Sequence, residues 1–186
     1  MIRIVPMDSE RTIPAIADDG SYYPIGKLEA HRRGVLHLAV SVFVYRDGKL
    51  LIQKRARDKY HCGGLWANTC CTHPDWNEDP ASCALRRLRE ELGIQLAVRP
   101  FGVQDYNADV GGGLREHERV HMFMGAATPE RISIVPNPEE VDRVRWVSEE
   151  ELRRGVAETP ERFTPWFRIY LNRGQVFQSE DMLAVV

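Results

Sequence analysis

The segment EDPASCALRRLREELG, residues 78–93, decides the fold, because it carries the start, the length and the end of one amphipathic helix. Asp79 can cap the first turn, Pro80 suits the first helical position and Gly93 suits the exit from the helix. Its apolar residues recur at helical spacing, and they are Ala81, Ala84, Leu85, Leu88 and Leu92. We therefore predict a helix over residues 80–92 with one apolar face.

The charged side of this helix has the pattern of a metal and phosphate site. Arg87 and Glu91 lie four residues apart, so they share a face. Glu91 borders the apolar stripe, where a carboxylate would point into a cleft beside the core. Mg²⁺ prefers carboxylate and phosphate oxygens, and arginine can bind phosphate through two nitrogens. An ordinary surface ion pair would explain Arg87 and Glu91 alone. Several positions together, however, have the spacing of a loop–helix–loop that binds a diphosphate. These positions are Glu78, Arg86, Glu90, Glu91 and Gly93.

Around this helix, strand signals alternate with helix signals. Apolar and polar residues alternate over 36–45 and 49–53, and Asp47-Gly48 between these runs is typical of a hairpin turn. Ser148 and Glu151 form a capping box that opens another helix. Further elements are expected at 119–126 and 141–147, as strands, and at 164–171, as a helix. Strands interleaved with helices predict an α+β fold.

The bulk composition limits the class of protein. A chain of 186 residues is enough for one domain with a sizeable core. Its net charge of -2 argues against a general nucleic-acid binder. We expect no membrane span, since no apolar run is long enough, and no signal peptide at the start. The four cysteines do not form a disulfide framework, so we expect a soluble protein of the reducing cytoplasm.

The spacing of residues 78–93 resembles the Nudix box, and residues 31–171 as a whole resemble the type I isopentenyl-diphosphate isomerases of the Nudix superfamily. Thr72 stands where the box of the hydrolases opens with glycine, and Arg87 stands where they have a glutamate. The isomerases share both departures. The resemblance implies a Nudix-type mixed β-sheet sandwich flanked by helices. We expect an N-terminal leader and strand segment at 1–30, the catalytic domain at 31–171 and a tail at 172–186.

The stretch Cys71-Thr72-His73-Pro74 resembles the cysteine motif of these isomerases. By that resemblance Cys71 is the catalytic thiol, and it forms an acid–base pair with Glu118, helped by Tyr106. Adjacent side chains of an extended segment point to opposite faces, so only one of the neighbouring cysteines can face the pocket. We assign a structural role to the remaining thiols, Cys70, Cys62 and Cys83, of which Cys62 has a weaker claim to the pocket rim.

The resemblance also implies two divalent metals. Mg²⁺ would bridge the substrate diphosphate to Glu91 and the Cys71 carbonyl. A second ion, Zn²⁺ or Mn²⁺, would bind a mixed nitrogen and oxygen set consisting of His31, His37, His73, Glu116 and Glu118. Each of these residues taken singly would more often be structural, and we leave the competing His121 in a structural role.

The family pattern supplies the remaining substrate contacts. The diphosphate would be held by cations, which are Lys27, Arg55, Lys59 and Arg87, with Arg57 and Arg86 as possible substitutes. Trp166 would place its ring against a carbocation, a contact worth about 2 kcal/mol or more in a dry pocket. Without the resemblance, both Trp166 and Tyr106 would be read as core aromatics.

We therefore expect an enzyme of isoprenoid biosynthesis that interconverts isopentenyl and dimethylallyl diphosphate. Its partner would be a small-molecule prenyl diphosphate, and the protein would be a monomer or weak dimer. Two alternatives stay open: a metal-dependent pyrophosphohydrolase of a nucleoside or prenyl diphosphate, and a non-catalytic metal-binding Nudix module. Thr72 and Arg87 argue against the first, and the joint presence of Cys71, Glu118, Tyr106 and Trp166 argues against the second.

Overall fold

A hairpin of two long, buried strands forms the centre of the structure, a computed structural model that describes residues 10–128 and 132–177. Strands β3 (His37–Arg46) and β4 (Lys49–Arg55) are joined at Asp47 and Gly48. Both turn residues have positive φ, 50° and 70°, as a tight two-residue hairpin turn requires. The predicted hairpin is thereby confirmed.

The other strands extend this hairpin into one mixed sheet. β3 pairs in parallel with β8 (Leu114–Ala126), which pairs antiparallel with β7 (Arg99–Gly111). β3 also pairs with β6 (Cys70–Thr72) and β1 (Thr12–Ile16), and β1 pairs with β2 (Tyr22–Gly26). On the far side of the hairpin, β4 pairs with β5 (Trp66–Ala67) and β9 (Val141–Val147).

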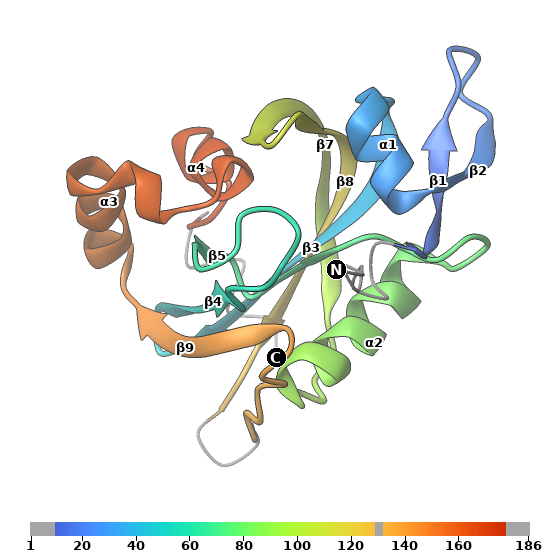
Figure 1. Ribbon diagram of the computed structural model, residues 1–186. Coiled ribbons are helices and arrows are strands. Elements are labelled where there is room, and N and C mark those ends of the chain that lie inside the picture. Colours follow the sequence, from blue (N-terminus) through green and yellow to red (C-terminus); the bar gives the residue numbers. More distant parts are fainter. Residues whose placement is uncertain (1–9, 129–131, 178–186) are drawn as a thin grey trace.

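Helices cover both faces of the sheet (Figure 1). α2 (Pro80–Leu92) packs on one face, where Leu88 and Leu92 meet Val42 and Val44 of β3. α3 (Glu149–Glu158) and α4 (Pro165–Asn172) pack on the other, where the Tyr170 ring meets the Phe43 ring with centroids 5.9 Å apart. Successive side chains of β3 therefore point into the hydrophobic cores on opposite faces of the sheet, because side chains alternate along a strand. The predicted α+β sandwich is confirmed.

The deciding helix has the predicted bounds. Asp79 accepts a hydrogen bond from the Ser82 amide at 2.9 Å, and Gly93 ends the helix with φ 67°. One member of the predicted apolar stripe is misplaced: Leu85 is 46% exposed. Its neighbour Ala84 takes the buried position, and a residue one step further along a helix points about 100° away.

The sequence predicted a strand segment within residues 1–30 without its bounds, where β1 and β2 lie, but it did not predict β7 or the short helix α1 (Lys27–Arg33). Ala30 of α1 packs with Ile13 and Ala15 of β1 in a small core of its own. The domain boundary predicted at residue 31 therefore lies inside α1. The parts of the predicted leader and tail at residues 1–9 and 178–186 lie outside the described residues. Among the described helices, none combines the length and apolar character that a membrane crossing needs.

Candidate functional site

A pocket of about 490 Å³, its open mouth included, gathers side chains from both halves of the sandwich. Its walls come from β3, β4, β6, β7, β8, α1, α2 and α4 and from the segments that connect these elements. All but two of the predicted site residues line it, and the two exceptions are His31 and His37, which contact lining residues from behind. The structure therefore brings residues that lie between positions 27 and 166 of the sequence into one place.

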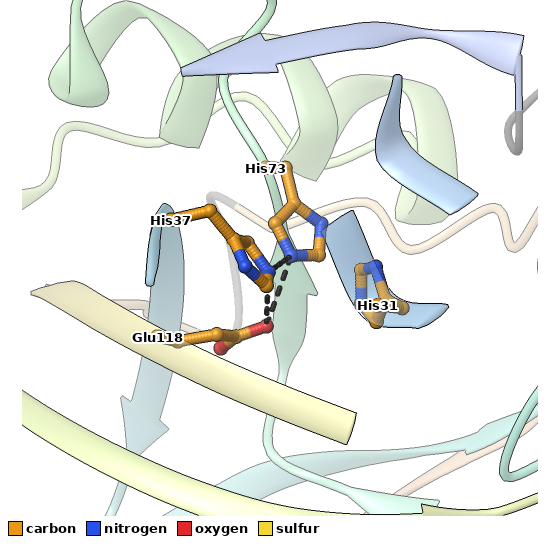
Figure 2. Close-up of side chains that lie close together, drawn as sticks. All are labelled: His31, His37, His73 and Glu118. Atoms are coloured by element: carbon orange, nitrogen blue, oxygen red, sulfur yellow. Dashed lines mark hydrogen bonds and ion pairs between the residues drawn. The ribbon is translucent and has the colours of Figure 1, made fainter. Parts of the chain in front are cut away.

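Three imidazoles and a carboxylate converge at one end of the pocket (Figure 2). His31 comes from α1 and His73 from the segment after β6, while His37 of β3 lies directly opposite Glu118 of β8 in the parallel register. His73 Nε2 lies 2.9 Å from Glu118 Oε1 and 3.2 Å from His37 Nε2. One ligand atom from each of the four residues lies within 4.8 Å of all the others, and all four residues are buried.

Hydrogen bonds on the outer side of the cluster orient two of these rings for a metal ion. His31 Nδ1 lies 2.7 Å from the Lys27 carbonyl oxygen, and His37 Nδ1 lies 2.8 Å from that of Val35. A carbonyl only accepts, so each Nδ1 carries the hydrogen and each Nε2 keeps a lone pair for a ligand. His31 Nε2 is buried and has no hydrogen-bond partner among the described residues.

The protonation states also fit a divalent ion. Burial lowers the pKa of His31 to about 3 and that of His73 to about 4, so both rings are neutral at pH 7. Burial alone would raise the pKa of Glu118, but the His37 and His73 imidazoles outweigh it and hold that pKa well below its usual range. His37 Nε2, His73 Nε2 and Glu118 Oε1 lie 2.9 to 3.6 Å from one another, so one cation between them could be bound by all three atoms.

A second carboxylate lies beside this cluster. The Tyr106 hydroxyl lies 2.8 Å from Glu116 Oε2 and 2.6 Å from Glu118 Oε2, so it bridges the two groups. Burial and the Glu118 charge raise the pKa of Glu116 well above its usual range. Glu116 and Glu118 both point inward, as expected for residues two apart in a strand.

The thiol of Cys71 faces the pocket from β6. Its Sγ accepts a hydrogen bond from Trp166 Nε1 at 2.9 Å and donates one to Asn68 Oδ1 at 2.7 Å. Burial raises the pKa of this thiol, so it keeps its hydrogen at neutral pH. Cys70 points into the opposite core and is fully buried there, which confirms that only one of the pair faces the pocket.

The opposite end of the pocket is built from cations and carboxylates. Glu91 accepts hydrogen bonds from Arg87 at 2.8 Å and from Gln53 at 2.9 Å. Glu140, which the sequence did not single out, lies 3.3 Å from Arg87 and 2.5 Å from Lys59. The proposed substitutes Arg57 and Arg86 do not line the pocket, and Arg86 is held by Glu78 instead.

Sequence reasoning missed several residues that line the pocket, which are Ser41, Gln53, His61, Glu140 and Tyr170. His61 carried no signal beyond being a histidine in a turn-prone segment. Tyr170 follows Trp166 by one helical turn, and that spacing is the only pointer that could have found it.

Comparisons with known proteins agree with this fold. A family model described as the NUDIX domain matches residues 35–167. A crystal structure of a Deinococcus radiodurans protein superimposes with a TM-score of 0.72 at 15% identity, covering 90% of this chain and 99% of that one. A MutT NUDIX hydrolase from Burkholderia pseudomallei superimposes with a TM-score of 0.56 at 27% identity, covering 76% and 98%.

Relatives with higher sequence identity indicate which NUDIX proteins this chain resembles most. The isopentenyl-diphosphate Delta-isomerase of Dinoroseobacter shibae is 59% identical over 154 residues, which cover 82% of this chain and 87% of that protein. The isomerase of the same name from Rhodobacter capsulatus is 52% identical over 176 residues, which cover 94% and 96%. The chain belongs to the NUDIX family and, within it, to the isopentenyl-diphosphate Delta-isomerases.

The convergent cluster predicts that divalent metal stabilises the fold. Mn²⁺ at one hundred times its dissociation constant should add about 2.7 kcal/mol to the free energy of unfolding, because the unfolded chain offers no site. The measurement is the thermal unfolding midpoint of chelator-treated protein with and without Mn²⁺ or Zn²⁺. His31→Gln should remove most of the shift, whereas the control His121→Gln, on the other side of β8, should retain it. An equal shift in wild type and His31→Gln would show that His31 is no ligand.

Proposed function

We propose that this protein interconverts isopentenyl diphosphate and dimethylallyl diphosphate in isoprenoid biosynthesis. The observation that carries the proposal is the placement of a thiol and a pair of carboxylates on one pocket: Cys71 on β6, and Glu116 with Glu118 on β8. The names of the relatives at 52–59% identity support the same reaction.

The isomerisation needs an acid and a base on one substrate. A proton adds to the terminal alkene carbon and gives a tertiary carbocation, and loss of a proton from the neighbouring methylene forms the new double bond. In our proposal Glu116, whose raised pKa keeps it protonated, passes a proton through the Tyr106 hydroxyl to Glu118, and Glu118 delivers it to the alkene. Cys71 removes the second proton in its thiolate form, which the Trp166 N–H stabilises, and the two roles exchange in the reverse direction.

The carbocation must be shielded from water. Trp166 is buried and touches Cys71 through its indole nitrogen, so its ring lies beside the place where we expect the reacting carbons. An aromatic ring face stabilises a cation in a dry pocket by about 2 kcal/mol or more. Trp166 therefore serves both as an orienting contact for the thiol and as a screen for the charged intermediate.

The diphosphate would occupy the cationic end of the pocket. We propose that Lys27, Arg55, Lys59 and Arg87 hold it, with Mg²⁺ at Glu91 and the Cys71 carbonyl, and with a second ion, Zn²⁺ or Mn²⁺, at the imidazole cluster that includes Glu116 and Glu118. A bound divalent ion would neutralise phosphate charge or polarise the carboxylates. Lys27 and Arg55 are nearly inaccessible, at 5% and 6% exposure, so a dianionic partner would offset the cost of burying them.

The helix of the box supports retention of the diphosphate rather than hydrolysis. Arg87 lies against Glu91 at 2.8 Å, and Glu90 lies outside the pocket, where it pairs with Arg86 at 3.0 Å. Within the described part of the helix, Glu91 is thus the carboxylate that faces the pocket. A hydrolase needs several carboxylates there to hold metals and activate water.

Product identification tests the reaction. The protein is incubated with isopentenyl diphosphate, Mg²⁺ and Mn²⁺, and the products are followed by NMR. Dimethylallyl diphosphate supports the proposal, whereas release of phosphate or pyrophosphate would identify a hydrolase. If the protein turns over no substrate but is still stabilised by metal, it would be a non-catalytic metal-binding module.

We also propose a monomer or weak dimer in the cytoplasm that acts on a small molecule. All four cysteines are unpaired, which supports a reducing compartment.

A further inference from the structure

Glu116 is held by two hydrogen bonds from different parts of the fold. Its Oε2 accepts from the Tyr106 hydroxyl at 2.8 Å, and its Oε1 lies 2.7 Å from His61 Nε2. His61 and Glu116 are both buried, at 8% and 3% exposure. The orientation of this carboxylate is therefore set by its partners rather than by solvent.

The His61 ring is itself held firmly. It stacks on the Tyr60 ring with centroids 4.4 Å apart, and its edge meets the His31 ring at 5.3 Å. Arg55 donates a hydrogen bond to the His61 carbonyl at 3.2 Å. The loop can close only around Gly63, where a Cβ would come within 2.3 Å of the Arg57 carbonyl oxygen.

His61 also links Glu116 to the imidazole cluster. One ligand atom each from His31, His61 and Glu116 lies within 4.8 Å of the other two. His31 belongs to this group and to the group of His37, His73 and Glu118. Holding Glu116 near His31 therefore keeps it within reach of an ion bound to the main cluster.

We propose that His61 is a positioning residue, whose Nε2–H holds Glu116 in the orientation required at the metal cluster. The inference rests on the proposed role of Glu116 as a metal ligand. Removing a residue that hydrogen-bonds to a metal-ligating carboxylate or histidine commonly lowers metal affinity by about 10- to 100-fold.

Three variants isolate the N–H donor. His61→Leu fills the space without a donor, and His61→Gln offers an amide N–H at a similar reach but is a poor metal ligand. His121→Gln is the matched control, a half-buried histidine on β8 that does not line the pocket. The readouts are Mn²⁺ affinity by titration, the visible absorption spectrum of the Co²⁺ form, and kcat and KM for isopentenyl diphosphate.

We expect His61→Leu to bind Mn²⁺ about 10- to 100-fold more weakly, with an altered Co²⁺ spectrum and a lower kcat at nearly unchanged KM. His61→Gln should recover most of the affinity. Wild-type affinity in His61→Leu, or a His61→Gln as weak as His61→Leu, overturns the proposal. Should His61→Leu fail to fold by circular dichroism, His61→Asn replaces it, because its shorter amide cannot reach Glu116.

The same experiment separates this inference from the proposed function. If wild type isomerises the substrate but His61→Leu binds metal normally, the positioning role fails and the function stands. If wild type does not turn over but the affinities follow the expected order, the proposed function fails and His61 still positions Glu116.

Discussion

Replacing Cys71 with alanine should lower kcat for isomerisation by about 10²- to 10⁴-fold, the usual contribution of a positioned acid or base. The thiol faces the pocket between Trp166 and Asn68, where alanine leaves no group to move a proton. KM should change little, because the cations expected to hold the diphosphate lie at the other end of the pocket. The measurement is steady-state conversion of isopentenyl diphosphate to dimethylallyl diphosphate, with folding checked by circular dichroism.

The neighbouring cysteine provides the control. Cys70 is fully buried in the α2 core, so Cys70→Ala should cost some stability while leaving kcat near the wild-type value. Near-normal turnover in Cys71→Ala would refute the assignment of the thiol. A loss in Cys70→Ala alone would show that the wrong member of the pair was chosen.

Changing Glu118 to glutamine should remove both metal binding and activity. The amide has the shape of the carboxylate but no charge, and its NH₂ group would compete with a cation for the His37 and His73 nitrogens. We expect Mn²⁺ affinity to fall by more than the about 10- to 100-fold typical of an outer partner. We also expect kcat to fall by about 10²- to 10⁴-fold.

Asp105→Asn is the matched control for this change. Asp105 lies on β7 next to Tyr106, but its carboxylate is exposed and pairs with Arg119 at 2.9 and 2.8 Å. An exposed pair contributes at most about 1 kcal/mol, so metal affinity and kcat should stay at wild-type levels. Tight Mn²⁺ binding by Glu118→Gln, measured by titration, would contradict the proposed ligand set.

Local signals explain which parts of the fold could be predicted. The hairpin turn at Asp47-Gly48 and the caps at Asp79 and Ser148 are set by residues close in sequence, and all were found. β1 and β2 each contain a proline, which argues against a strand. Pro14 and Pro24 are tolerated because they lie opposite each other in the outer β1–β2 pair.

The site residues likewise fall into those set by local sequence and those set by tertiary packing. Cys71, His73 and the box helix were found because they form a continuous pattern, and the resemblance placed the remote residues. His61 and Glu140 belong to no such pattern. They enter the pocket because a loop turns inward at Gly63 and because Glu140 precedes β9, and both depend on tertiary packing.

The parallel register of β3 and β8 has a consequence for the timing of folding. His37 and Glu118 are about 80 residues apart, and they become neighbours only once these strands have paired. Closing so long a loop costs entropy before any contact repays it, so such pairs form slowly. The metal cluster is then complete only after the slowest step. A divalent ion should therefore leave the folding rate unchanged and lower the unfolding rate. Metal binding would then slow the separation of β3 from β8 once the two strands have paired.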